Sequence, residues 1–403
     1  METPKIISID DHVLEPADLW LRYLPARFRD AAPRLVRMRG RFGDGPRGGW
    51  LATDEGDWAD IWVFEDTQMA IIPGFAAAGK DQNYLGAHWD PMTYDDMLPG
   101  CYDPSARLAD MDLNHTDGSI AFPTFPRFCG QTFLEQGARD LALACVQAYN
   151  DWMIDEWCSG AAQGRLIPLT LIPLWDVDLA AAETRRCAAK GSHAIAFSEN
   201  PTRLRLPSVH TDHWDPLWAA CQDTDTVVNM HIGSSSTFPM TSLDAPRAVS
   251  LALTYQGAAH GFADWLCSGV LDRFEELRIA WSEGQVGWMP FILERLDSVW
   301  SDRPAYGNLD GRVRSLPSSY LAGRVFGCVF DDVVGLRLRD QIGMDQIMFE
   351  VDYPHGDSTW PNSKAVLEKI ATQADLSEDE TRRLARGNAI RCYGLDRHFG
   401  VFQ

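Results

Sequence analysis

Four short apolar runs in this sequence end in a carboxylate or an imidazole. The residues are Asp10 and His12 in IISIDDH, His231 in TVVNMH, Glu283 in LRIAWSE, and Asp352 in IMFEVD. Carboxylates and imidazoles bind divalent ions such as Zn²⁺ and Mn²⁺, which can activate water or polarise a substrate oxygen. A lone Asp after a strand is more often a helix cap, but four such endings together favour chemistry. We predict one divalent ion, Zn²⁺ or Mn²⁺, held by Asp10, His12, His231 and Asp352.

Two groups beside these ligands could move protons, together with Asp352 itself. Glu283 ends one of the apolar runs, and His355 follows Asp352 by three residues in the loop YPHGDSTW. A metal ion lowers the pKa of bound water to roughly 7, so a nearby base can take its proton. We predict that Glu283, Asp352 and His355 are catalytic. The competing interpretation of His355 is a histidine that only fixes its loop.

Two further side chains could contact a substrate. Arg127, in PTFPRF, could hold a substrate carboxylate, although a surface ion pair is the competing interpretation. Trp360 lies in the same loop as His355 and could line a pocket. The 15 Trp residues exceed what a core needs, which favours an aromatic pocket or a subunit interface. We expect a small-molecule substrate and a homodimer or larger homo-oligomer.

The elements that position these residues are predicted to be strands alternating with helices. Apolar runs of about six residues are typical of strands covered on both faces of a parallel sheet. Eight such runs occur, at 5–12, 118–123, 165–174, 194–198, 226–231, 277–283, 326–330 and 347–352. Helical periodicity at 134–156 and a capping box at Ser377 and Glu380 indicate helices around them.

This alternation predicts one α/β domain over residues 1–403, a distorted (β/α)8 barrel of the TIM type. A doubly wound sheet is the rival fold, but no GxGxxG follows the first strand. In a barrel the carboxyl ends of the strands gather at one face, which is where the candidate ligands stand.

Residues 35–109 interrupt the alternation. They are rich in Gly, Asp and Trp and show no clear period of 3.6 or 2.0 residues. Structureless stretches of this length are uncommon in compact domains unless they are functional. We predict a long, irregular, acidic insertion that covers the barrel mouth or a subunit interface.

The charge of the chain narrows the classes of partner. Lys and Arg number 36 against 57 Asp and Glu, a formal net charge of -21, which argues against nucleic acid and anionic membranes. No run of 18 apolar residues and no basic-then-apolar leader is present, so we expect a cytoplasmic protein. The nine cysteines contain no CxxC pair, and we expect them to be reduced and buried.

Several segments together resemble one known family. They are IDDHVLEP, AFPT, AYNDWMIDE, DPLWAAC, LRIAWSEGQVGWMPFILERLD, FEVDYPHGDSTWPNS and GNAIRCYGLD. With them the chain resembles the amidohydrolase superfamily, in particular the amidohydrolase-related branch that includes aminocarboxymuconate-semialdehyde decarboxylase and the resorcylate-type decarboxylases. The resemblance implies a distorted (β/α)8 barrel with one divalent metal, usually zinc or manganese. It places the family's ligands on Asp10, His12, His231 and Asp352.

Two departures from the family pattern affect the predicted reaction. Asp10 stands where many relatives have His or Glu, and Glu283 stands where the sixth strand usually ends in His. The second departure changes the acid or base, so we expect a hydrolase that uses metal-activated water on a C–N or related polar bond of a small cyclic or aromatic substrate. One alternative is non-oxidative decarboxylation of an aromatic acid. The other is a catalytically silent barrel that acts as a binding protein.

Overall fold

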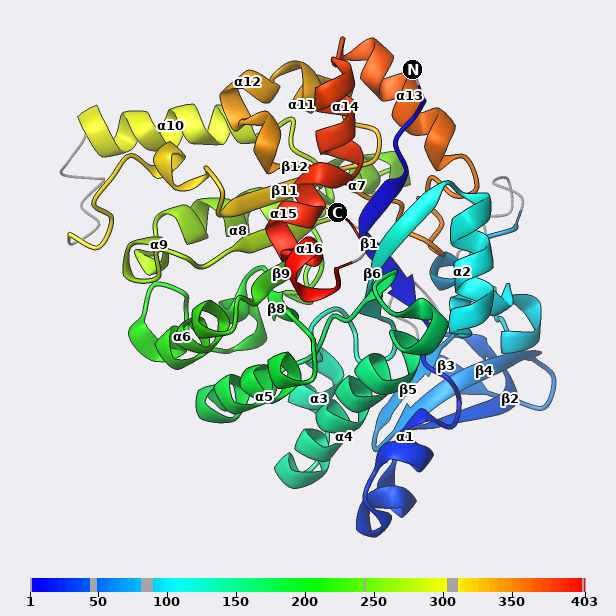
Figure 1. The fold of residues 1–403 in the computed structure, drawn as a ribbon. Helices are drawn as coiled ribbons and strands as arrows, with labels where there is room; N and C mark the ends of the chain where they lie inside the picture. The colour runs from blue at the N-terminus through cyan, green and yellow to red at the C-terminus, as the bar shows by residue number, and fades with distance from the viewer. Residues whose placement is uncertain are drawn as a thin grey trace.

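A ring of parallel strands forms the centre of the protein (Figure 1). The computed structural model describes residues 2–43, 49–80, 90–242, 244–302, 311–400 and 402. In this part of the chain the parallel strands are β1 Ile6–Val13, β6 Thr116–Pro123, β7 Leu166–Ile167, β8 Ala194–Ser198, β9 Val227–His231, β10 Ile279–Ser282, β11 Val325–Val329 and β12 Ile347–Phe349. They pair in chain order, as β1-β6-β7 and β8-β9-β10-β11-β12.

Two junctions close the ring. Thr170 forms a parallel bridge to Ile195 in β8, which joins the two sheets on one side. On the other side the Asp352 N–H donates to the Asp10 carbonyl at 2.8 Å, and the His12 N–H donates to the Tyr353 carbonyl at 2.6 Å. The result is the predicted (β/α)8 barrel, and its second junction lies among the predicted metal ligands.

Helices surround the ring. They are α1 Leu19–Tyr23, α2 Pro104–Leu113, α3 Gln131–Glu135, α4 Arg139–Trp152, α5 Val177–Ala189, α6 Asp215–Asp223, α7 Arg247–Leu253, α8 Gln256–Leu266, α9 Val270–Arg273, α10 Met289–Asp302, α11 Val333–Arg337, α12 Arg339–Ile342, α13 Ser363–Gln373, α14 Glu378–Arg382, α15 Asn388–Tyr393 and α16 Leu395–His398. The predicted capping box is present, because the Ser377 hydroxyl accepts from the Glu380 N–H and the Glu380 carboxylate accepts from the Ser377 N–H.

The predicted strand at 165–174 is much shorter in the structure. Only Leu166–Ile167 pairs as a strand, because Pro168 and Pro173 cannot donate to a ladder. Residues 247–273 form three helices, α7, α8 and α9, and the last break falls at Gly269, whose φ of 74° no helix residue adopts.

The prediction that residues 35–109 are irregular is wrong for their first half. This part forms a four-stranded antiparallel sheet in the order β3-β2-β4-β5, with β2 Arg34–Phe42, β3 Trp50–Ala52, β4 Asp57–Phe64 and β5 Thr67–Ala70. In β4, Trp62 and Phe64 face the barrel core while Ala59 and Ile61 join a second small cluster, so both faces are apolar and no alternation is visible. Residues 44–48 and 81–89 lie outside the described residues.

Most of the Trp side chains that we expected in a pocket or interface fill the core instead. Trp20, Trp62, Trp152, Trp157, Trp214, Trp218, Trp265 and Trp281 are less than 2% exposed. The cysteines are free and buried as expected, except for the half-buried Cys267. Among the described residues, no helix is both long and apolar enough to span a membrane.

Candidate metal centre

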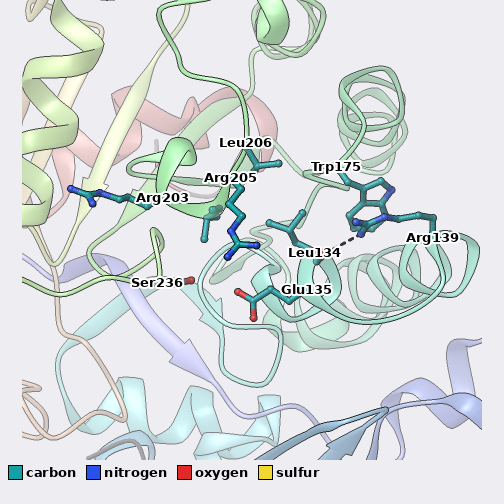
Figure 2. Close-up of a pocket in the computed structure, with 9 residues that line it drawn as sticks. Leu134, Glu135, Arg139, Trp175, Arg203, Arg205, Leu206 and Ser236 are labelled. Carbon is teal, nitrogen blue, oxygen red and sulfur yellow. Dashed lines mark hydrogen bonds between the residues drawn. The ribbon is translucent and has the colours of Figure 1, made fainter.

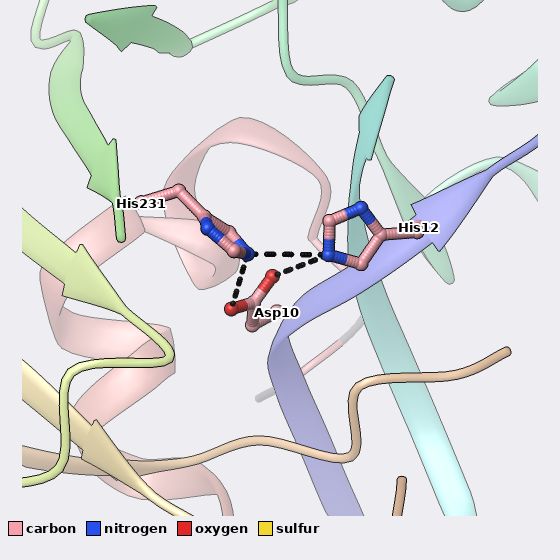
Figure 3. A group of neighbouring side chains, drawn as sticks. All are labelled: Asp10, His12 and His231. Atoms are coloured by element: carbon pink, nitrogen blue, oxygen red, sulfur yellow. Dashed lines mark hydrogen bonds and ion pairs between the residues drawn. The ribbon is translucent and has the colours of Figure 1, made fainter. Parts of the chain in front are cut away.

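The four predicted ligands converge near the carboxyl ends of β1, β9 and β12. Figure 3 shows three of them, Asp10, His12 and His231. The two imidazoles face each other, with 3.2 Å between His12 Nε2 and His231 Nε2. Asp10 lies between them. Its Oδ1 is 3.6 Å from His12 Nε2, and its Oδ2 is 3.3 Å from His231 Nε2. Asp352 Oδ1 is 3.4 Å from His12 Nε2. The set therefore comes together as expected from strand ends far apart in the sequence.

The His231 imidazole presents a lone pair to this point. His231 Nδ1 lies 2.6 Å from the Ile232 carbonyl, an acceptor, so Nδ1 carries the proton and Nε2 is free to bind. Burial lowers the pKa of His231 to about 3, and burial together with His355 holds the pKa of His12 well below its usual range. Two neutral imidazoles are the form that binds a metal.

The carboxylates provide the second half of the donor set. Asp10 and Asp352 are at most 1% exposed, and none of their four oxygens accepts a hydrogen bond from a described residue. Burial raises the pKa of both well above the usual range, with a further contribution to Asp10 from Glu350 and Asp352. Buried carboxylates without donors are costly unless a cation pairs with them. Two imidazole nitrogens and two such carboxylates fit Zn²⁺ or Mn²⁺.

Two residues of the site, Asp352 and Glu283, have an unusual backbone conformation. Asp352 has φ 60° and Glu283 has φ 51°, both in the left-handed region that glycine prefers. Each is held there by a hydrogen bond, from the Asp352 N–H to the Asp10 carbonyl and from the Glu283 N–H to Glu350 Oε2 at 2.9 Å. Strained residues of this kind cluster at functional sites because the surrounding structure must stabilise them.

The predicted proton-handling groups flank the ligands. Glu283 Oε2 is 3.5 Å from His231 Nε2, and its side chain is 17% exposed. His355 Nδ1 is 3.0 Å from Asp352 Oδ1, and its ring stacks on His12 with 3.6 Å between ring centroids. Burial raises the pKa of Glu283 well above its usual range, and the Asp352 carboxylate raises it further. Both groups can therefore reach an atom bound next to the ligands.

Most of this chain matches the model of a known protein family. The model of the amidohydrolase family matches residues 58–395. The chain belongs to this family. The resemblance found in the sequence is thereby confirmed. The matched range begins after β1, so the assignment of Asp10 and His12 rests on their position beside His231 and Asp352.

Individual relatives of this amidohydrolase are distant. Gamma-resorcylate decarboxylase of Rhodococcus jostii is 24% identical over 284 residues, which are 64% of this chain and 79% of that protein. The crystal structure of an amidohydrolase from Mycobacterium avium subsp. paratuberculosis matches with a TM-score of 0.70 at 21% identity, covering 98% of this chain and 100% of that one. A dihydroxybenzoic acid decarboxylase from a Polaromonas species, solved with manganese and the inhibitor 2-nitroresorcinol, gives 0.60 at 16% identity, covering 99% and 100%. The two solved structures establish the fold.

A further carboxyl group, Glu350, lies next to the candidate ligands and was not predicted from the sequence. Glu350 is fully buried, and its Oε2 accepts the Glu283 N–H at 2.9 Å and the Cys328 thiol. Burial raises the pKa of Glu350 to about 8. The signal was present, because Glu350 precedes Asp352 by two residues, the same spacing that puts Asp10 and His12 on one face of β1.

Asp11 has the structural role expected of the residue between two ligands. It accepts hydrogen bonds from the Ser8 hydroxyl at 3.1 Å, from the Ser119 hydroxyl, and from the Tyr353 N–H at 3.0 Å. These partners lie on β1, on β6 and just after β12. Asp11 therefore ties three strands together directly behind the ligands.

A small apolar cavity opens beside the ligands. Its volume is about 310 Å³, and it is lined by His12, Met69, Phe75, Pro123, Thr124, Arg127, Phe128, Phe238 and His355; we call it the histidine cavity. Met69 and Phe75 come from residues 35–109, so this segment contributes to the barrel mouth. The cavity is large enough for one small aromatic molecule.

The two predicted substrate contacts differ in where they lie. Arg127 lines the histidine cavity and is also in an ion pair, with Nη1 2.8 Å from Glu135 Oε2. Trp360 lies elsewhere: its Nε1 donates to the Asp110 carbonyl at 3.2 Å, and it lines a separate small cavity with Asp11. Of the two, only Arg127 reaches the space beside the ligands.

Proposed function

We propose that this amidohydrolase is a metal-dependent carboxy-lyase that removes carbon dioxide from a small aromatic acid bearing a neighbouring hydroxyl. The observation that carries the proposal is the set of two imidazoles and two unpaired carboxylates at the edge of a 310 Å³ cavity lined by phenylalanines. The decarboxylases among its relatives support it, including one solved with manganese.

The candidate ligand set supports a divalent metal ion as the cofactor. Asp10, His12, His231 and Asp352 would hold one divalent ion, and the solved relative favours Mn²⁺ over Zn²⁺. When bound, the ion supplies positive charge that orients and polarises the carboxylate and hydroxyl oxygens of the acid.

The walls of the histidine cavity account for binding and orientation. Phe75 and Phe128 offer apolar faces to an aromatic ring, and Arg127 adds a cation at the rim for an anionic substituent. Because the cavity is small and apolar, a bound ring leaves little space for water. Loss of a charged carboxylate as neutral carbon dioxide is favoured where water does not stabilise the charge.

Proton delivery falls to groups of the chain. The bond between ring carbon and carboxylate breaks, its electron pair stays on the ring carbon, and that carbon takes a proton. Glu283 can supply the proton because its raised pKa keeps it protonated to a higher pH than an ordinary carboxyl group. His355, stacked on His12 and in contact with Asp352, orients Asp352.

Hydrolysis, our expectation from the sequence, remains the second candidate. It is favoured by the carboxylate of Glu283 at the end of β10, which could take a proton from water. The comparisons support the decarboxylase alternative better, since the relatives named for a reaction are decarboxylases.

The test is a product assay in heavy water. Protein with its bound metal quantified is incubated in D₂O with a panel of hydroxybenzoic acids and a panel of cyclic amides. We expect carbon dioxide release and one deuterium on the ring carbon that lost the carboxylate. Amine release from the amides, without carbon dioxide from the acids, would overturn the proposal. A chain that retains no metal and changes neither panel would identify a binding protein.

A further inference from the structure

A second cavity lies at the same end of the barrel as the histidine cavity. Its volume is about 640 Å³, and it is walled by segments that follow β6, β7, β8 and β9 (Figure 2). Its polar and aromatic lining consists of Glu135, Arg139, Trp175, Arg203, Arg205 and Ser236, and we call it the arginine pocket. Because carboxyl-end loops of a barrel carry specificity, a cavity built from four of them is a candidate binding site.

The arginine pocket has an excess of positive charge. Three arginines line it against one carboxylate, Glu135, and that carboxylate is engaged by Arg127 at 2.8 Å. The side chains of Arg203 and Arg205 are exposed and form no hydrogen bond or ion pair with another residue in the described part of the chain. Arg203 and Arg205 therefore bring two unpaired positive charges to this pocket in a chain with a net charge of -21. They favour an anionic ligand.

The rest of the lining is apolar. Arg139 stacks over the half-buried Trp175, with 4.9 Å from its Cζ to the ring centroid, and donates to the Leu134 carbonyl at 3.0 Å. Figure 2 shows this stack across the cavity from Arg205. Leucine side chains complete the wall. A ligand that fits is an anion with an apolar body rather than an inorganic ion.

The backbone at Arg205 is a second, independent observation. Arg205 follows the short turn Pro201–Leu204 with φ 61°, in the left-handed region. Glycine would end this turn without strain. Arg205 therefore occupies a backbone conformation that glycine would adopt more easily.

One ion pair separates the arginine pocket from the histidine cavity. Arg127 lines the histidine cavity, and its guanidinium is held by Glu135 at 2.8 Å and by the Ser236 hydroxyl. Glu135 and Ser236 both line the arginine pocket. A ligand in that pocket therefore contacts the residues that position Arg127 beside the ligands.

We propose that the arginine pocket binds an aromatic carboxylate and holds it next to Arg127 before it enters the histidine cavity. The choice of an aromatic carboxylate rests on the proposed function, whereas the preference for an apolar anion rests on the lining alone. An acidic protein repels anions over most of its surface, and a local cluster of cations raises their concentration where it is needed.

The test is direct binding of 5-fluoro-2-hydroxybenzoate, which carries the neighbouring hydroxyl that the proposed function requires, to the metal-containing protein, followed by calorimetry and ¹⁹F line broadening. We expect two binding sites in the wild type. Arg205→Gly, which suits the φ of the turn, should weaken one of them roughly tenfold, as expected for loss of one charge-assisted contact. Arg205→Lys should restore part of that affinity. Arg382→Gln, which removes an equal charge on α14, is the matched control and should change neither site.

Separate variants distinguish the two sites. His231→Ala should remove the site in the histidine cavity and leave the arginine pocket intact. If the wild type binds only one equivalent, and Arg205→Gly weakens it while His231→Ala does not, the arginine pocket stands and the proposed function fails. Unchanged binding in Arg205→Gly would overturn the inference. If decarboxylation is found, Arg205→Gly should lower kcat/KM several-fold at low salt and leave kcat unchanged.

Discussion

The two cavities at the carboxyl end of the barrel are built in opposite ways. The histidine cavity lies beside side chains from strand ends, where Asp10, His12 and His231 are at most 1% exposed and hydrogen bonds fix the backbone around them. The arginine pocket draws its cations from exposed loop and helix positions that make few contacts. Strand ends thus hold the candidate ligands in fixed positions, whereas loops carry exposed side chains that can adapt to a bound molecule.

The largest expected effect is loss of a ligand from the strand ends. His231→Ala or Asp352→Asn should lower bound metal and abolish turnover, since a donor is removed from a buried set that cannot be completed by water alone. Metal analysis and the carbon dioxide assay measure both effects. The exposed His213→Ala is the matched control, and normal metal content and turnover in His231→Ala would remove the basis of the comparison.

Replacing the proton-handling carboxyl should separate chemistry from binding. Glu283→Gln keeps the shape of the side chain and should lower kcat by about 10²–10⁴-fold, the usual contribution of a general acid, while metal content stays at the wild-type level. Steady-state kinetics measure the change in kcat, and metal analysis measures the metal content of the variant. A parallel loss of metal would show that Glu283 is a ligand and that the role assigned to it is wrong.

The rigidity of the strand ends can be measured through Asp11. Asp11→Ala leaves the donors of Ser8, Ser119 and Tyr353 without their acceptor, and should lower the free energy of unfolding by about 2–4 kcal/mol. Denaturant unfolding gives the value. Asp18→Ala, at a carboxylate that is 60% exposed, should change it by less than about 0.5 kcal/mol. Equal effects of the two variants would contradict the tie that we assign to Asp11.

The smallest expected effect is that of a variant outside both cavities, Glu380→Gln, on the free energy of unfolding. Arg339 and Ser377 lower the pKa of Glu380 from 4.5 to about 2. The ionised Glu380 carboxylate therefore stabilises the folded state fully above pH 4.5, and this contribution to the free energy of unfolding is lost as the pH falls from 4.5 towards 2. Glu380→Gln should cost about 1 kcal/mol at neutral pH and nothing near pH 2, in unfolding curves recorded across that range. Glu378→Gln, in the same turn, is the control; a pH-independent cost in Glu380→Gln would refute the assignment.

The convergence of the candidate ligands could be predicted because their signal is local. Each candidate ends an apolar run, and parallel strands bring their carboxyl ends to one face whatever the loops do. The same rule, applied once more, would have found Glu350 two residues before Asp352. Val36, Met38 and Gly40 alternate with arginines in β2, which is the pattern of a strand. The glycines and aspartates of the neighbouring turns obscured this pattern.

The arginine pocket could not be predicted in this way. Its residues come from segments after four different strands, and their meeting depends on loop conformations such as the left-handed turn at Arg205. Trp360 was assigned to the site by its place in the sequence, yet its ring points to Asp110.

The hydrogen bond from the Asp352 N–H to the Asp10 carbonyl joins two segments that lie far apart in the sequence. During synthesis on the ribosome, the segment that carries Asp10 and His12 emerges long before its partner exists. A nascent chain that stops short of residue 352 therefore holds only part of the candidate metal centre, and this junction of the barrel can close only after that residue has emerged.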